Sequence, residues 1–321
     1  MRINVWAPVL IALSLAAAVQ AQDRSPAKPV RMVIAFPPGG STDIVGRIVS
    51  QKLSERLGQQ VVVENRGGAG GSIGTEAVAR AAPDGHTLTL ATTSTHVVAP
   101  AAYEKLNYDP VKDFTAISLV AVTPYLLVVH PSLEVRTLKE FVTYVKARPG
   151  KFNYASAGSG STTQIAMEML KSEAGLFVVH IPYNGGAPAQ TALLAGQTDL
   201  MIVDLGAAMP GIRAGKLRAL ALGSERRTEL LPGVATINEA LPGFVATGWL
   251  AMAAPPKTPV AITTRLAQAV AEALRQPDVA KRVREMNFDS VGSTPAELAA
   301  FIRQENERWG KVIRALGVKV E

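Results

Sequence analysis

The chain has 321 residues, 48% of them hydrophobic and 18% charged, with a formal net charge of +7 at pH 7. This length allows one large domain or two of ordinary size. Basic residues are scattered and aromatic residues make up only 5% of the chain, which excludes a nucleic-acid groove but suits small anions. The chain has no cysteine, so disulfides, thiolate metal sites and a lipidated cysteine are excluded.

The first 21 residues have the pattern of a secretory signal peptide. Arg2 precedes an apolar stretch at 9–19, and Val19-Gln20-Ala21 fits a small-x-small cleavage site. A retained membrane anchor is the less favoured alternative, because no stretch reaches the roughly 18 uninterrupted apolar residues of a spanning helix. We therefore expect a periplasmic chain, cleaved near Ala21, that is a soluble monomer.

The first element pair joins an apolar strand at 30–34 to a helix whose apolar residues recur from 44 to 57. The turn between them contains Gly39 and Gly40, and we expect Gly40 to adopt a positive φ. Exposed N–H groups at such a turn and at the helix start can bind an anion, although a plain strand-to-helix connection remains an alternative. Asp43 is expected to complement the helix dipole rather than to contact a ligand. Arg47 lies further along the helix and is expected to matter little.

Strands and helices alternate through the rest of the chain. We expect strands at 61–64, 87–91, 125–129, 152–157, 177–182, 200–203, 217–222 and 249–253. Helices are expected near 73–82, from 137 to 149, from 165 to 170, and throughout the segment after 256 at 262–275, 279–286 and 298–316. Two of them open with the sequence of a capping box, Thr137 to Glu140 and Thr294 to Glu297.

This alternation predicts an α/β fold with parallel sheets covered by helices. Long apolar runs at 117–129 and 245–254 interrupt the series and can pair as two hinge-crossing strands. We therefore predict two lobes, one formed by 22–124 with 250–321 and the other by 125–249. A single large sheet is the alternative. Gly-, Ser- and Thr-rich turns at 36–43, 92–96, after Ala157 and at 183–188 then meet between the lobes, where carboxylate oxygens can be bound.

Motifs for cofactor binding and metal-dependent catalysis are missing from the sequence. From Gly68-Ala69-Gly70 the third glycine of a dinucleotide fingerprint would fall at position 73, which is Ile, and there is no Walker or HExxH sequence. The four histidines have no metal-ligand spacing, so we expect no metal and no cofactor. Ser94 or Ser161 could act as a nucleophile only if a histidine, such as His96, and a carboxylate came near. An exported α/β hydrolase therefore stays open as the alternative function.

An ordered set of segments resembles the Bug-type extracytoplasmic solute receptors of the tripartite tricarboxylate transporter family. The set runs from about residue 30 to the C-terminus. It includes Phe36-Pro37-Pro38-Gly39-Gly40-Ser41-Thr42-Asp43, Val62-Val63-Glu64-Asn65-Arg66, Gly68-Ala69-Gly70-Gly71, Ala82-Pro83-Asp84-Gly85, Tyr108-Asp109-Pro110-Val111-Lys112-Asp113-Phe114, Pro149-Gly150-Lys151-Phe152-Asn153-Tyr154-Ala155-Ser156, Val179-His180-Ile181-Pro182-Tyr183 and Ala214-Gly215-Lys216-Leu217-Arg218-Ala219-Leu220-Ala221.

The resemblance implies a two-lobed type II periplasmic binding protein that holds a small carboxylate between its lobes. Backbone N–H groups and waters near Gly39 and Gly40 would bind one carboxylate, and the loop 158–163 the other. Two departures concern specificity: Gln164 replaces a frequent His, and Val203-Asp204 replaces a pair containing Asp or Asn. Asp204 is expected either to select an ammonium group or to cap the next helix.

We therefore expect a periplasmic, non-enzymatic receptor for a di- or tricarboxylate, an amino acid or an aromatic acid. It would close on the ligand by hinge motion and deliver it to the membrane permease of a tripartite tricarboxylate transporter or to a sensor. The expected ligand-binding residues are Phe36, Gly39, Gly40, Ser41, Thr42, Asp43, Ser94, His96, Gly158, Ser161, Thr162, Tyr183, Gly186 and Asp204.

Overall fold

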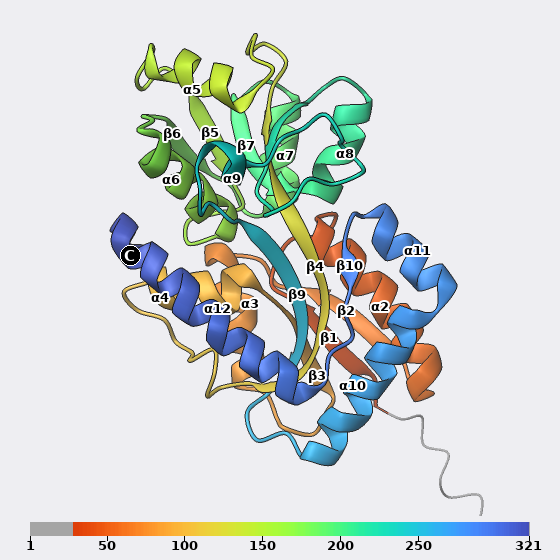
Figure 1. Cartoon of the computed structure of the whole chain (residues 1–321). Helices are drawn as coiled ribbons and strands as arrows, with labels where there is room; N and C mark the ends of the chain where they lie inside the picture. The colour runs from red at the N-terminus through yellow and green to blue at the C-terminus, as the bar shows by residue number, and fades with distance from the viewer. Residues whose placement is uncertain (1–27, 321) are drawn as a thin grey trace, which may run out of the picture.

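A computed structural model describes residues 28–320, and the predicted signal peptide lies outside this range. Figure 1 shows two lobes joined by long strands. The strands are β1 (Val30–Ile34), β2 (Val61–Asn65), β3 (Thr87–Thr92), β4 (Thr115–Val129), β5 (Asn153–Ser156), β6 (Val179–Pro182), β7 (Leu200–Asp204), β8 (Arg218–Leu222), β9 (Thr247–Ala254) and β10 (Asp289–Ser290). Each of the nine predicted strand segments lies in or overlaps one of them, which confirms the α/β class.

Helices cover the strands of both lobes (Figure 1). They are α2 (Ser41–Leu57), α3 (Ser72–Ala79), α4 (Ala99–Ala102), α5 (Leu138–Lys146), α6 (Thr162–Ala174), α7 (Gly186–Leu194), α8 (Leu205–Arg213), α9 (Ile237–Ala240), α10 (Val260–Arg275), α11 (Pro277–Glu285) and α12 (Pro295–Leu316), with short turns η1 (Ala69–Gly71) and η2 (Ser94–Val98).

Strand β4 belongs to both lobes. Its first ten residues pair with β9, and its last five, 125–129, pair with β7 and β8. The strand order is β2-β1-β3-β9-β4-β7-β5-β6, with β8 and β10 also paired to β4. The predicted pairing of the two long apolar runs is therefore confirmed, and β4 connects the lobes.

The hinge is completed by three backbone hydrogen bonds where the chain crosses between lobes. Tyr125 N donates to Ala246 O at 3.2 Å, Ala246 N to Gly223 O at 2.7 Å, and Gly223 N to Tyr125 O at 2.7 Å. The three residues come from β4, the end of β8 and the segment before β9. The exact lobe limits, 22–124 with 250–321 and 125–249, remain a prediction.

Two expectations about the sheet and the C-terminal segment were wrong. The sheet is mixed, because β9 runs antiparallel to both β3 and β4, and β4 is antiparallel to β7. A strand that returns from the other lobe enters from the opposite end, which reverses its direction. The segment after 256 is not wholly helical either, since Asp289–Ser290 forms β10 against β4. The expected turn at 92–96 becomes helical from Ser94 and continues into α4.

The helix caps follow the sequence closely but not completely. Thr294 and Glu297 form the reciprocal capping box predicted for α12. At α5 only half of the box forms: Thr137 accepts from Glu140 N, while the Glu140 carboxylate accepts from Arg136 N. These contacts fix where each helix starts.

Four clusters of buried apolar residues lie in the described part of the chain, and the two largest are described here. In the first, α2, α10 and α11 pack on strands β1, β3 and β9. The second includes α5, α6, β7 and the face of α12. Buried Glu305 of α12 accepts from Trp249 Nε1 at 3.1 Å and from Trp309 Nε1 at 3.3 Å, which ties α12 to β9. In Figure 1, α12 runs across the first lobe and ends beside α6.

Candidate ligand-binding site

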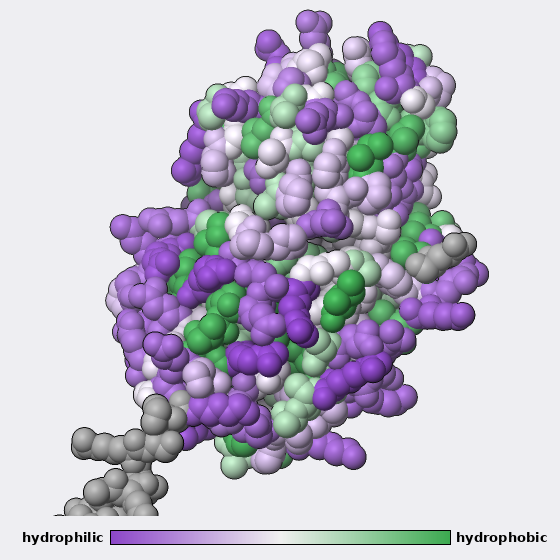
Figure 2. Space-filling model, turned by 180° about the vertical axis from the view of Figure 1, so that it is seen from behind, coloured by the Kyte–Doolittle hydropathy of each residue, from purple (hydrophilic) through white to green (hydrophobic). Residues whose placement is uncertain are grey.

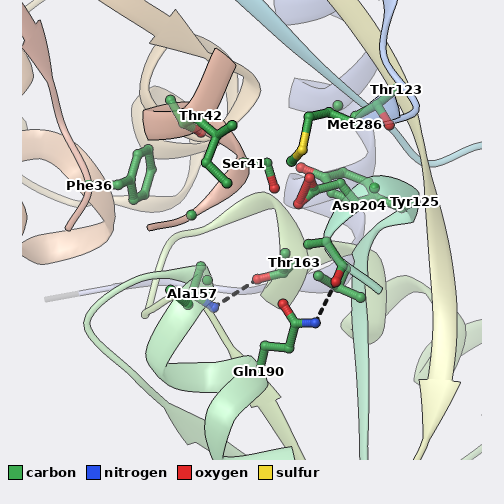
Figure 3. Close-up of a pocket in the computed structure, with 18 of the residues that line it drawn as sticks. Phe36, Ser41, Thr42, Thr123, Tyr125, Ala157, Thr163, Gln190, Asp204 and Met286 are labelled. Atoms are coloured by element: carbon green, nitrogen blue, oxygen red, sulfur yellow. Dashed lines mark hydrogen bonds between the residues drawn. The ribbon is translucent and has the colours of Figure 1, made fainter. Parts of the chain in front are cut away.

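A cavity of about 470 Å³ lies between the two lobes. The four Gly-, Ser- and Thr-rich turns predicted from the sequence all contribute to its wall, with residues from 36–42, 92–94, 157–163 and 186–187. Figure 3 shows Phe36, Ser41 and Thr42 on one side of the cavity and Ala157 and Thr163 on the other. The hinge strands add Thr123, Tyr125 and Trp249. A volume of this size suits a small organic molecule.

The first turn presents backbone donors to the cavity. Gly40 is the N-cap of α2 with φ −79°, so the expectation of a positive φ at Gly40 was wrong; the left-handed residue is Gly39, with φ +88°. Among residues 28–320, the amides of Gly40, Ser41 and Thr42 have no hydrogen-bond acceptor. Because the N–H groups of a first helical turn have no intrahelical partner, they can bind an anion there. Phe36, Gly39, Gly40, Ser41 and Thr42 line the cavity.

Asp43 supports this turn from behind and does not line the cavity. Its side chain is 4% exposed. Its carboxylate accepts from Gly39 N at 3.0 Å and from Arg47 Nε at 3.0 Å to each oxygen. Burial alone would raise the pKa of Asp43, but hydrogen bonds from Arg47, Gly39 and Asn65 hold it below its ordinary value. Asp43 is therefore charged and fixes the shape of the turn.

Asn65, at the end of β2, completes the support. Its Nδ2 donates to Phe36 O at 3.0 Å and to Asp43 Oδ1 at 2.9 Å, while its Oδ1 accepts from Arg47 Nη2 at 2.9 Å. The expectation that Arg47 matters little overlooked this role, since Arg47 contacts both residues that hold the turn. One signal of this contact was present in the sequence, the i, i+4 spacing of Asp43 and Arg47.

The lobes touch at the edge of the cavity. Ser94, which lines it, pairs through Oγ with Thr162 Oγ1 at 2.9 Å and accepts from Thr162 N at 3.0 Å. Tyr103 OH donates to Ser159 O at 2.9 Å. Ser94 and Thr162, which were both expected to bind the ligand, thus contact each other, but Thr162 is fully buried rather than lining the cavity.

The second-lobe turn contributes a different residue from those expected. Thr163 lines the cavity and its Oγ1 accepts from Ala157 N at 2.9 Å (Figure 3). Ser161 is fully buried and caps α6 by accepting from Gln164 N at 3.4 Å. Gly158 lies on a second, smaller cavity of about 240 Å³ rather than on the main one.

Helix α7 supplies further contacts beside this turn. Gly186 lines the main cavity, as expected, whereas Tyr183 lines the smaller one. Gln190, one turn into α7, also faces the main cavity and donates to Ala207 O (Figure 3). The sequence did not indicate Gln190, because helical periodicity alone does not say which face meets the other lobe.

Asp204 ends β7 and lines the cavity near Ser41 and Tyr125 (Figure 3). It occupies the N-cap position of α8, but its side chain accepts no capping hydrogen bond, so the alternative that Asp204 caps this helix was wrong. Burial raises the pKa of Asp204, opposed in part by the Ser41 side chain and by the backbone N–H of Asp204. Its Oδ1 is shielded from solvent and unpaired among the described residues.

His96 does not line the cavity. It is 0% exposed, lies 4.6 Å from Phe114 between ring centroids, and pairs through Nδ1 with Thr95 Oγ1 at 3.0 Å. Burial lowers the pKa of His96 to about 3, so the ring is neutral and supplies no charge to an anionic ligand.

The geometry offers no catalytic triad in the part of the chain that the structure describes. Ser94 and Ser161 pair with threonines, not with a histidine. Ser72, within the pattern Gly70-Gly71-Ser72-Ile73-Gly74, donates to Ala69 O. His180 does contact Ser156 at 2.6 Å, but that serine is fully buried and the other ring nitrogen faces an amide. An attacking serine needs access and an oriented base, and neither is combined here.

The wall near α8 and α11 is apolar and was not predicted. Ile44 comes from α2 and Met209 from α8, while Met286 and Phe288 lie in the connection between α11 and β10. Within residues 28–320, no helix is long and apolar enough to cross a membrane, and no group of three acidic or histidine side chains could hold a metal ion.

The cavity lies between two lobes that share a strand, and the turns that line it present free backbone donors. This arrangement defines a two-lobed solute-binding protein. The model of the tripartite tricarboxylate transporter family receptor matches residues 45–318. The chain belongs to this family, whose members include the Bug proteins; these are periplasmic substrate-binding proteins and not enzymes, which rejects the hydrolase alternative.

Similar proteins agree with this assignment. Protein BugT of Bordetella pertussis is 37% identical over 315 residues, covering 98% of this chain and 97% of BugT. The structure of periplasmic binding protein BugD matches with a TM-score of 0.88 at 34% identity over 92% of this chain and all of that chain. The structure of R. palustris Rpa4515 with adipate matches with a TM-score of 0.88 at 33% identity, over 92% of this chain and 99% of that chain. The structure of MatC from Rhodopseudomonas palustris with bound malate matches with a TM-score of 0.86 at 36% identity, over 90% of this chain and 99% of that chain.

Proposed function

We propose that the protein captures a small organic carboxylate in the periplasm and delivers it to the membrane permease of a tripartite tricarboxylate transporter. The observation that carries this proposal is the row of free amides at Gly40, Ser41 and Thr42, which opens on a ligand-sized cavity between the lobes. The similar proteins that hold adipate and malate support a carboxylate as the ligand.

In this proposal each side of the cavity binds part of the ligand. Gly40, Ser41 and Thr42 donate backbone N–H groups to one carboxylate, and Phe36 and Gly39 shape the space around it. Ser94, Thr163, Gly186, Gln190 and Asp204 contact the remainder. Because the ligand touches both lobes only when they are together, binding favours closure about the hinge at Tyr125 and Ala246.

Export precedes this function. We propose that the signal peptide is removed near Ala21, so that the mature chain begins near Gln22. We also propose that the receptor is a monomer. Hydrophilic residues cover most of the rear face in Figure 2, and hydrophobic residues appear there in separate small groups. No large apolar patch on that face calls for a partner.

The test is calorimetry and thermal shift with malate, succinate, adipate, citrate and benzoate at pH 7. A receptor gains stability by RT ln(1 + [L]/Kd) and returns its ligand unchanged. We expect at least one acid to raise the Tm in a saturable way and to be recovered intact. If no carboxylate shifts the Tm while a neutral or cationic compound does, the proposed ligand class is wrong.

A further inference from the structure

Asp204 is an acidic side chain of the cavity without an ion-pair partner among the described residues. It forms no ion pair in residues 28–320 and receives no capping hydrogen bond from α8. Its Oδ1 has no hydrogen-bond partner there and is shielded from solvent. A buried, unpaired carboxylate oxygen is unfavourable, which is why burial raises the pKa of Asp204, and a hydrogen-bond donor from the ligand would offset that cost.

The unpaired acid lies next to the anion-binding turn. Figure 3 shows Asp204 beside Ser41, the first residue of α2, with Tyr125 adjacent. The free amides of Gly40, Ser41 and Thr42 form the positive pole of the site, and Asp204 in its deprotonated form supplies a negative pole at its edge. A ligand that fits both poles carries a negative group and a hydrogen-bond-donating positive group on neighbouring atoms.

The rest of the cavity does not compensate Asp204. The other charged side chains that line it are Arg213 at the end of α8 and Glu285 at the end of α11, and both are exposed. A diacid would therefore bring its second carboxylate towards Asp204 with no buried cation between them. A zwitterion avoids that repulsion: its ammonium group favours the charged form of Asp204, which burial alone disfavours, and donates a charge-assisted hydrogen bond to it.

We propose that Asp204 makes this receptor select an organic acid that carries a protonated amine beside its carboxylate, as an α-amino acid does. The inference rests on the proposed function, because the carboxylate must bind at α2 for the amine to reach Asp204. In the bound state the ammonium group donates to Asp204 Oδ1, and the apolar wall formed by Ile44, Met286 and Phe288 faces the side chain of the ligand.

The experiment compares acids that differ only in the amine. The pairs are L-aspartate with succinate, L-glutamate with glutarate, and L-phenylalanine with 3-phenylpropionate, titrated by calorimetry at pH 7. For the pair that fits the cavity, we expect the amino acid to bind at least about tenfold more tightly, as a charge-assisted hydrogen bond allows. In Asp204→Asn, which keeps the shape and removes the charge, this preference should vanish or reverse.

Glu285→Gln is the matched control, because it removes an exposed carboxylate from the same cavity and should leave the preference unchanged. Equal or tighter binding of the diacid or plain acid by the unmodified protein overturns the inference. An unchanged preference in Asp204→Asn, or an equal loss in Glu285→Gln, overturns it as well. In all these outcomes carboxylates still bind and the proposed function stands. If none of the six acids, malate or adipate binds, the proposed function fails and the inference fails with it.

Discussion

The two sides of the cavity are built on different principles. On the first lobe, backbone amides at Gly40, Ser41 and Thr42 face the cavity, while the charged side chains Asp43 and Arg47 stay behind the turn. On the second lobe, side chains such as those of Thr163, Gln190 and Asp204 face the cavity directly.

This difference separates affinity from specificity. Backbone donors are the same whatever the side chain, so the first turn recognises a carboxylate through its shape and the helix dipole. Side chains can be exchanged one at a time, so the second lobe can change ligands without a change of fold. Mutations on the first side should therefore act through bulk or through loss of support, and mutations on the second side through lost contacts.

The largest effect on ligand binding is expected from a larger side chain at Gly40 in the first turn. An added Cβ at Gly40 meets nothing within 4 Å, and its φ of −79° suits any residue, so Gly40→Val should fold normally. Its methyl groups would occupy the space in front of the free amides and weaken carboxylate binding on the order of 100-fold. Calorimetry measures the affinity, with Gly233→Val, an equally open glycine away from the cavity, as the control. Unchanged affinity in Gly40→Val would show that the anion binds elsewhere.

The next effect is expected from the support behind the turn. Asp43→Asn should lower the free energy of unfolding by about 2 kcal/mol, because it removes charge-assisted hydrogen bonds to a buried group. The pKa of Asp43 is lowered in the folded state, so its contribution is full above the ordinary value of 3.8 and is lost as the pH falls through the folded pKa. The stability difference between the two proteins should therefore shrink below about pH 4.

Urea denaturation at several pH values measures this difference. Asp289→Asn, which removes an exposed carboxylate in β10, serves as the control and should change stability by less than about 0.5 kcal/mol. A difference between Asp43→Asn and the unmodified protein that grows as the pH falls would contradict the assignment of Asp43 as a charged support.

The smallest effect on binding is expected at Ser161. The sequence suggested that this hydroxyl binds the ligand, but the structure places it under the turn as the cap of α6. Ser161→Ala should therefore lower stability by about 1 kcal/mol and change affinity by less than about threefold. Thr163→Val, at the cavity wall, should weaken binding more, because the Ala157 amide loses its acceptor. If the order of the two affinities is reversed, Ser161 contacts the ligand after all.

The sequence predicted the fold well because strands and helices here follow local patterns. The run 30–34, the glycine turn and the apolar spacing after residue 44 each correspond to the structure. The pairing of β4 with β9 was also predictable, since both are long apolar runs that interrupt the alternation. Strand direction was not, because it depends on which lobe the chain returns from.

The site was predictable as a set of turns but not as a set of side chains. Asp43 was correctly placed in the first helical turn, but its bonds to Asn65 join residues 22 positions apart and have no local signal. His96 follows a strand end, as a ligand contact would, yet it is buried among Thr95 and Phe114. Gln190 was missed because the packing of the two lobes decides which face of α7 borders the cavity.

The position of β9 has a consequence for how the chain assembles. It lies between β3 and β4 in the sheet, so the first lobe lacks a central strand until residues 247–254 have been made. The strands and helices from β5 to β8, by contrast, are contiguous in sequence and make mostly nearer contacts. Because closing long loops slows folding, the second lobe should form first and the first lobe should be completed last. Until then its N-terminal strands stay in an incomplete sheet.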